Sequence, residues 1–199
     1  MRERYIAAPL AKDVIEALLR ACPPGRLGSR DKAAIVLLWR CGLRSREVTN
    51  LNIRDLEPHA GLVHVAPLKR SKGRSVGIGP IEVEVLHRWL YERRQIQGAD
   101  WTPESPLLCS MRGRRLNPCQ LRRALVKLAA RAGVQGHVSP HRLRHSFATE
   151  LARERTSIGV IQAALGHRSL ASTEVYLARI TPAELAELAR GRPDWTEDK

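Results

Sequence analysis

No apolar run in this sequence reaches the roughly 18 residues that a membrane-spanning helix requires. The first five residues, Met-Arg-Glu-Arg-Tyr, also lack the apolar stretch of a secretory signal peptide. We therefore expect a cytoplasmic protein that has no membrane anchor.

Cysteine is scarce, with only Cys22, Cys41, Cys109 and Cys119 in the chain. None of them belongs to a CxxC pair, and their spacing matches no metal-ligand pattern. In a reducing compartment such residues are free thiols that pack as small hydrophobes. The sequence therefore predicts neither a disulfide framework nor a zinc site.

Acidic residues are few compared with basic ones. The chain has 34 Lys and Arg against 20 Asp and Glu, a net charge of +14, and about five in six of the cations are arginine. The planar guanidinium suits bidentate contacts to phosphate better than an ammonium does. A domain this basic usually binds nucleic acid. On charge alone, a merely soluble basic protein and a membrane-surface binder remain as alternatives.

The basic residues are concentrated in two stretches that contain no acid. One comprises Lys69, Arg70, Lys72 and Arg74. The other comprises Arg112, Arg114, Arg115, Arg122, Arg123, Lys127 and Arg131. Two such patches on one small body suggest a groove that wraps a DNA duplex.

The first part of the chain predicts helices. Apolar spacing indicates an amphipathic helix over residues 9–22, which a Pro-Pro pair ends, and a loop is expected over residues 25–29. Residues 33–39 are apolar on all sides, which is typical of a helix buried in the middle of a domain. This helix stops at Gly42, and a new one starts after Ser45.

A small sheet is expected next. Residues 62–65 and 75–78 have the composition of two short strands, and the segment 67–74 between them would be a charged hairpin tip. Residues 80–96 return to helical spacing, and a connector follows over residues 98–106.

The second half again predicts helices. Asn117-Pro118 and Ser139-Pro140 each place an N-cap residue before a proline at the first helical position. One further helix ends at Gly166, and a capping box at Thr181 opens a last short one. The 199 residues fit a single domain. The predicted fold is mostly α with a small antiparallel β-sheet, of the α+β class.

Two motifs carry potential chemistry. In Ser139-Pro140-His141-Arg142-Leu143-Arg144-His145, helical spacing places His141, Arg144 and His145 on one face. Downstream, Leu165-Gly166-His167 is followed nine residues later by Tyr176. Taken alone, the first motif is no more than a solvated basic face, and a lone tyrosine is more often a core residue than a nucleophile.

Together with two upstream segments, these motifs resemble the catalytic domain of the tyrosine recombinase, or phage integrase, family. The family has H-x-x-R, then L-G-H and a tyrosine nine residues on. Gly42-Leu43-Arg44-Ser45-Arg46-Glu47-Val48 is similar to its first box, G-L-R-x-x-E-[LV]. Lys69 to Val76 is similar to its hairpin, K-x-x-K-x-R-x-V. The four elements occur in the family's order and span residues 42–176.

The resemblance implies a metal-free cleavage of DNA without any cofactor, and a role for each matched residue. Tyr176 would attack a backbone phosphate and form a 3′-phosphotyrosyl bond. Arg44 and Arg144 would clamp the phosphate oxygens, with a hydrogen bond from His167. His141 would handle the proton of the tyrosine, and Lys69 would protonate the leaving 5′-oxygen.

Other residues near the motifs have supporting or competing interpretations. Glu47 is expected to orient His141 or Arg44, or simply to brace the site. His145 is expected to support structure or bind the DNA backbone. Lys72 is the alternative to Lys69 as the general acid, but the spacing of Lys69 to Arg74 and Val76 favours Lys69. DNA-binding contacts are expected from the cations Arg70, Lys72, Arg74, Arg112, Arg114, Arg115, Arg122 and Arg123.

The resemblance also implies an organisation. Residues 1–180 would form the catalytic domain, and residues 181–199 a helix and tail that pack either on the same subunit or on a neighbour. The catalytic pattern starts near the beginning of the chain, so the sequence is expected to be either a short recombinase like the fimbrial-switch invertases or a fragment of a longer protein. The partners implied are double-stranded DNA in the nucleoid, three further subunits in a tetramer that forms on DNA, and accessory DNA-binding proteins. A type IB topoisomerase-like enzyme and a non-catalytic DNA-binding relative are the alternatives.

Overall fold

The computed structural model describes residues 8–67, 73–154 and 156–166. Over these ranges the elements are α1 (Lys12–Arg20), α2 (Arg26–Trp39), α3 (Ser45–Asn50), a short 3-10 helix (Ile53–Asp55), β1 (Leu56–Glu57), β2 (Leu62–Val65), β3 (Arg74–Gly77), α4 (Pro80–Arg94), α5 (Pro118–Arg131), α6 (Pro140–Arg153) and α7 (Ile158–Leu165). No described helix has both the length and the apolar character needed to cross a membrane. The expectation of a mostly helical fold with a small antiparallel sheet is confirmed.

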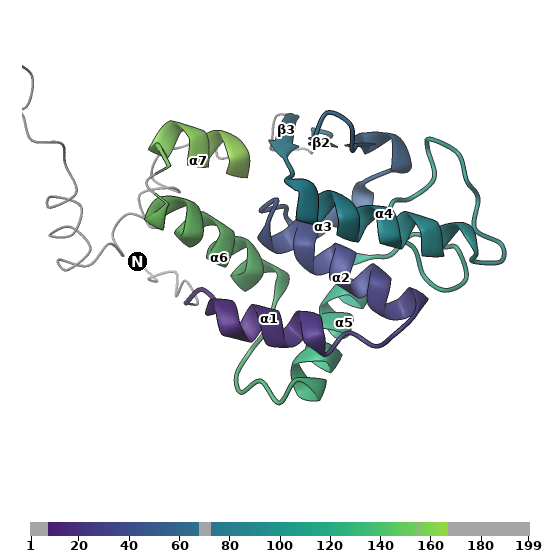
Figure 1. Ribbon diagram of the computed structural model, residues 1–199, viewed down its shortest axis with the longest axis horizontal. Helices are drawn as coiled ribbons and strands as arrows, with labels where there is room; N and C mark the ends of the chain where they lie inside the picture. The colour runs from purple at the N-terminus through teal and green to yellow at the C-terminus, as the bar shows by residue number, and fades with distance from the viewer. Residues whose placement is uncertain (1–7, 68–72, 155, 167–199) are drawn as a thin grey trace, which may run out of the picture.

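Helix α2 lies at the centre of the fold (Figure 1). It packs against α4 and α6, and also contacts α3 and α5. The stretch from Ala33 to Leu38 is buried on every side, as its continuous apolar run predicted. The first residues of the candidate site follow this helix directly, so they are attached to a buried part of the core.

The sheet has three strands in the order β1-β2-β3, and both pairs are antiparallel. Val63 pairs with Val76, and Val65 pairs with Arg74. The valines are buried, whereas His64 and Ser75 lie on the other face, because side chains alternate along a strand. Strand β1 was not predicted; it has two residues, too few for an alternation pattern to be visible in the sequence.

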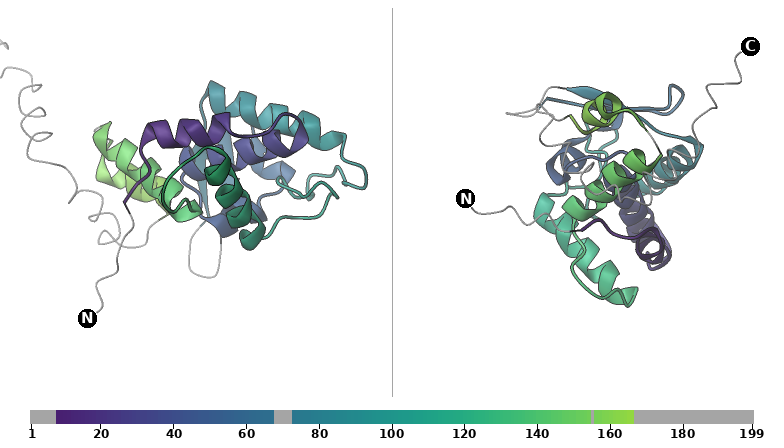
Figure 2. Two further views of the ribbon diagram at one scale, coloured as in Figure 1. Left: turned by 90° about the horizontal axis from the view of Figure 1, so that it is seen from below. Right: turned by 90° about the vertical axis from the view of Figure 1, so that its left-hand side faces the viewer.

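Most helix ends lie where the local sequence placed them. The side chains of Asn117 and Ser139 accept hydrogen bonds from the amides of Gln120 and Arg142, at the starts of α5 and α6. Gly166 ends α7 in the left-handed conformation, with φ of 61°. Helix α7 packs against α6 and beside β3 (Figure 2), through a small apolar cluster that includes Phe147 and Leu165.

The start of α2 was predicted wrongly. Residues 25–29 were expected to form a loop, but the helix begins at Arg26. Gly25 adopts a positive φ of 77° and makes the turn from α1, so only this residue needs to be glycine for conformational reasons. Gly28 lies inside the helix, where a β-carbon would collide with the carbonyl oxygen of Pro23. The two glycines resemble a loop in the sequence, but Gly25 makes a turn and Gly28 allows a close contact inside the helix.

All four cysteines are free thiols, as expected. Cys22, Cys41 and Cys109 are buried, whereas Cys119 is exposed near the start of α5. The predicted helix at Thr181 and the tail over residues 181–199 lie outside the described residues.

Candidate active site

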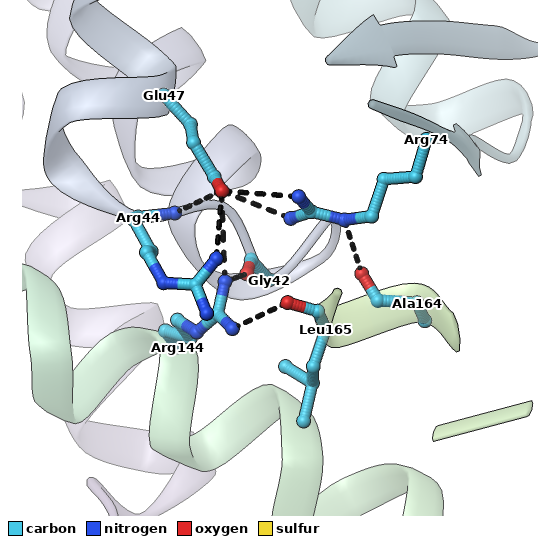
Figure 3. Close-up of polar contacts among 7 residues, drawn as sticks. All are labelled: Gly42, Arg44, Glu47, Arg74, Arg144, Ala164 and Leu165. Carbon is cyan, nitrogen blue, oxygen red and sulfur yellow. Dashed lines mark hydrogen bonds and ion pairs between the residues drawn. The ribbon is translucent and has the colours of Figure 1, made fainter. Parts of the chain in front are cut away.

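The carboxylate of Glu47 lies at the centre of the candidate site (Figure 3). Glu47 is in the first turn of α3, and its Oε2 accepts a hydrogen bond of 2.8 Å from the main-chain amide of Arg44. Its Oε1 accepts a second hydrogen bond of 2.8 Å from Nη1 of the Arg44 guanidinium. A glutamate at this position satisfies an amide that the helix leaves unpaired. The side chain of Glu47 is fully buried.

Arg74 reaches the same carboxylate from the first residue of β3. Its Nη1 and Nη2 donate to Oε1 and Oε2 of Glu47 over 3.0 and 2.9 Å, in a bidentate arrangement. Its Nε donates to the carbonyl oxygen of Ala164 in α7 over 2.8 Å. Only 8% of the Arg74 side chain is exposed. The sequence grouped Arg74 with the DNA-binding cations, but the structure places its guanidinium inside the site.

Arg144 approaches Glu47 from α6. Its Nη1 lies 3.6 Å from Oε2 of Glu47 and donates to the carbonyl oxygen of Gly42 over 2.5 Å. Its Nη2 donates to the carbonyl oxygen of Leu165 over 2.6 Å. Gly42 has a φ of 61°, and a β-carbon there would collide with the ring of Phe147. Glycine at this position therefore lets the main chain turn and present its carbonyl to Arg144.

We call Arg44, Glu47, Arg74 and Arg144 the Glu47 cluster. Burial alone would raise the pKa of Glu47, but the hydrogen bonds from Arg74 and the Arg44 amide and the charges of Arg74 and Arg144 lower it to about 2. One carboxylate among three guanidiniums leaves a net positive charge. The side chain of Arg44 is 39% exposed, against 5% for Arg144, so the positive charge is open to solvent mainly at Arg44. Such an arrangement attracts an anion.

His141 and His145 lie on α6 next to Arg144. Their rings are stacked, with centroids 6.5 Å apart and an interplanar angle of 18°. His145 is buried, whereas His141 is exposed at the start of the helix. Partial desolvation of its imidazole and then the charge of Arg144 lower the pKa of His141. The ring is therefore neutral at physiological pH and able to accept a proton.

The structure thus brings Arg44 and Arg144 to one carboxylate and places His141 on the same helix as Arg144. Glu47 contacts Arg44, one of the two partners expected for it, and also Arg74 and Arg144, which were not expected. The remaining predicted site residues Lys69, Arg70, Lys72, His167 and Tyr176 lie outside the described residues.

The second basic stretch divides into two kinds of arginine. Arg112, Arg114, Arg122 and Arg123 are exposed on and before α5, and we call them the exposed arginines. Arg115 is exposed as well, but its guanidinium contacts the end of α3: Nη1 donates to the carbonyl oxygens of Thr49 and Leu51, and Nη2 donates to Oδ1 of Asn52. The sequence does not distinguish Arg115 from its neighbours, because its acceptors are more than 60 residues away.

The sequence does contain one unused indication for Arg74. Residues two apart in a strand share a face, so Arg74 must lie on the same face as Val76, which is buried. An arginine on the buried face of a strand needs a carboxylate partner. This alternation could have identified Arg74 as a residue of the site. Among the described residues, no group of three His, Cys, Asp or Glu side chains is arranged to hold a metal ion.

The chain belongs to the phage integrase family, whose family model matches residues 9–181. It is 36% identical over 151 residues to the tyrosine recombinase XerC of Alcanivorax borkumensis, covering 75% of this chain and 48% of that protein. It is 35% identical over 195 residues to the tyrosine recombinase XerC of Syntrophus aciditrophicus, covering 96% of this chain and 63% of that protein. The chain thus spans about half to two thirds of the length of these relatives.

Solved structures show the same fold. The crystal structure of XerA recombinase superposes with a TM-score of 0.80 and 30% identity, covering 96% of this chain and 67% of that one. The XerH site-specific recombinase, in its post-cleavage complex with a palindromic difH substrate, superposes with a TM-score of 0.74 and 27% identity, covering 92% of this chain and 53% of that one.

Proposed function

We propose that this chain is the catalytic part of a site-specific DNA recombinase that cuts and rejoins DNA through Tyr176. The observation that carries the proposal is the convergence of Arg44 and Arg144 on Glu47, two cations from distant segments held at one place. A phosphodiester undergoing transfer gains negative charge on its non-bridging oxygens, and fixed guanidiniums stabilise that charge. They supply the charge that a magnesium ion supplies in other phosphoryl-transfer enzymes.

The proposed cleavage step uses each matched residue once. The hydroxyl oxygen of Tyr176 bonds to phosphorus, and its proton passes to His141, whose lowered pKa keeps the ring neutral beforehand. The bond between phosphorus and the 5′-oxygen breaks, and Lys69 donates a proton to that oxygen. Arg44, Arg144 and His167 bind the non-bridging oxygens. Rejoining is the reverse, so the phosphotyrosyl bond conserves the energy of the broken one.

Glu47 holds the two arginines of the clamp rather than touching the phosphate. The exposed arginines, with Arg70 and Lys72, bind the DNA backbone, and His145 supports His141. We further propose that residues 1–180 form the catalytic domain, that residues 181–199 contribute to subunit contacts, and that a tetramer assembles on two duplexes in the nucleoid. The DNA-bound difH complex of XerH supports double-stranded DNA as the substrate.

A nicked suicide substrate tests the proposal directly, because loss of a short fragment after cleavage traps the covalent intermediate. In the presence of EDTA, the wild-type chain should form a DNA adduct that resists denaturant, and Tyr176→Phe should form none. Tyr91→Phe is the matched control, since Tyr91 is 68% exposed on α4 and should not affect the adduct. An adduct with Tyr176→Phe would refute the nucleophile assignment.

The reaction products separate recombination from its alternatives. Strand exchange between two cognate sites is the expected result. Relaxation of supercoils without site preference would indicate a topoisomerase-like enzyme, and DNA binding without any adduct would indicate a non-catalytic relative.

A further inference from the structure

Arg74 joins three elements that lie far apart in the sequence. It begins β3, its guanidinium holds both oxygens of Glu47 in α3, and its Nε holds the carbonyl oxygen of Ala164 in α7. These three contacts come from three different nitrogen atoms, and the side chain is 8% exposed. Each of the three guanidinium nitrogens of Arg74 therefore has an acceptor within the protein.

The contacts of Arg74 fix the end of α7. Arg74 and Arg144 hold the carbonyl oxygens of the consecutive residues Ala164 and Leu165. Such carbonyls carry the partial negative charge of a helix C-terminus and are stabilised by cations. Gly166 follows, and a β-carbon there would lie 3.1 Å from Nη1 of Arg74. Arg74 therefore packs against the residue that directly precedes His167.

The contacts of Arg74 also fix one end of the β2–β3 hairpin. Arg74 pairs with Val65 across the hairpin, and Gly73 lies so close to Val65 that a β-carbon on it would be 3.3 Å from the Val65 carbonyl oxygen. Lys69 lies five residues before Arg74 in the sequence, between β2 and β3 and outside the described residues. An arginine that anchors this end to Glu47 thus anchors the base of the segment that carries Lys69.

We propose that Arg74 is a positioning residue, which aligns the hairpin of Lys69 and the end of α7 with the arginine clamp. This inference rests on the proposed function, in which Lys69 is the general acid. Arg74 also donates hydrogen bonds to both oxygens of Glu47. The carboxylate therefore neutralises less of the positive charge of Arg44 and Arg144, which bind the phosphate. It replaces the expectation that Arg74 is a contact to the DNA backbone.

The test compares two substrates that differ in one atom. In the first, the scissile bond ends in the normal 5′-oxygen, which needs a proton to leave; in the second, a 5′-bridging sulfur replaces it and leaves as a thiolate without an acid. Single-turnover cleavage is measured at saturating protein for the wild type, Arg74→Met, Arg74→Lys and Lys69→Ala. The ratio of the sulfur rate to the oxygen rate is the readout, because the fraction of folded protein cancels in it.

Arg74→Met should slow cleavage of the oxygen substrate about 100-fold and raise the ratio at least tenfold, toward the value of Lys69→Ala. Arg74→Lys retains the charge but not the bidentate geometry, so its ratio should lie between those of Arg74→Met and the wild type. The dissociation constant for DNA and its salt dependence should change less than about threefold, whereas Arg114→Met, the control, should weaken binding and leave the ratio unchanged.

Two results would overturn the inference. If both substrates slow equally in Arg74→Met and Arg74→Lys, Arg74 only supports folding or the clamp. If binding weakens, its salt dependence falls by about one phosphate contact and the ratio stays at the wild-type value, Arg74 is a backbone contact. Failure of the wild type to cleave either substrate would instead refute the proposed function.

Discussion

The Glu47 cluster and the exposed arginines contain the same kind of side chain in opposite surroundings. In the cluster, Arg74 and Arg144 are buried and each guanidinium has fixed acceptors. Arg112, Arg114, Arg122 and Arg123 are exposed to solvent. Fixed cations stabilise charge at one point in space, whereas exposed cations attract a polyanion without defining a position. The proposed function therefore uses the first group for catalysis and the second for binding strength.

Removing the central carboxylate should have the largest effect on the free energy of unfolding. Glu47→Gln leaves three guanidiniums without an anion, so we expect a loss of about 3 kcal/mol in the free energy of unfolding and at least about 100-fold in cleavage rate. Chemical denaturation and single-turnover cleavage measure the two losses. Glu104→Gln is the control: its carboxylate pairs with Arg54 on the surface and should matter by less than about 1 kcal/mol. Equal losses of unfolding free energy and cleavage rate in the two variants would show that the buried carboxylate matters no more than a surface one.

The low pKa of Glu47 predicts a particular pH dependence. Because its pKa in the folded state is about 2, below the ordinary value of 4.5, its contribution to stability is complete above pH 4.5. The contribution is lost as the pH falls from there toward 2. The difference in unfolding free energy between wild type and Glu47→Gln should stay constant between pH 7 and 5 and shrink below pH 4.5. A difference that grows on acidification would contradict the assignment.

Arg115 shows whether the role of an arginine follows from its position in the sequence or from its contacts. Although it lies beside Arg114, its guanidinium satisfies two carbonyl oxygens and an amide oxygen. Arg115→Ala should reduce the free energy of unfolding by about 2 kcal/mol, because the Thr49 carbonyl and the Asn52 side chain each lose a hydrogen bond, while the Leu51 carbonyl keeps its bond from the Leu107 amide. Arg114→Ala should change it by less than about 0.5 kcal/mol. Thermal and urea unfolding of both variants would show whether Arg115 stabilises the fold, as the arginines of the Glu47 cluster do.

The smallest effects are expected from the exposed arginines taken singly. Arg122→Ala and Arg123→Ala should each weaken DNA binding several-fold and reduce the slope of log K against log salt by about 0.9 for each lost phosphate contact. Cleavage at saturating protein should not change. A salt titration of binding, measured beside single-turnover rates, provides both values. A lower rate at saturation would move these residues into the catalytic group.

Local signals in the sequence predicted most of the fold. Caps such as Asn117, Ser139 and Gly166 specify helix ends through contacts within a few residues, so their effect is visible in a short window. The start of α2 was missed because Gly28 is required by a close contact with the Pro23 carbonyl, which composition does not distinguish from the glycine of a loop. Strand β1 was missed because only its pairing with β2 defines it.

The sequence identified several residues of the candidate site but few of the contacts between them. Resemblance to the family supplied Arg44, His141 and Arg144, and the structure brings the two arginines together. The hydrogen bond from Arg74 to Glu47 spans 27 residues and depends on where the fold places β3 relative to α3. Only the alternation of β3 indicated it, since Arg74 shares a face with buried Val76.

Arg144 offers the most direct test of the division between fixed and exposed cations. Cleavage of a suicide substrate and the dissociation constant for DNA are measured for Arg144→Ala, Arg144→Lys and the double variant Arg122→Ala/Arg123→Ala. The Arg144 variants should lose about 1,000-fold in cleavage and less than about tenfold in binding, while the double variant should lose binding and keep its rate at saturation. Equal losses of cleavage and binding in the Arg144 variants would make Arg144 a docking contact and contradict the account.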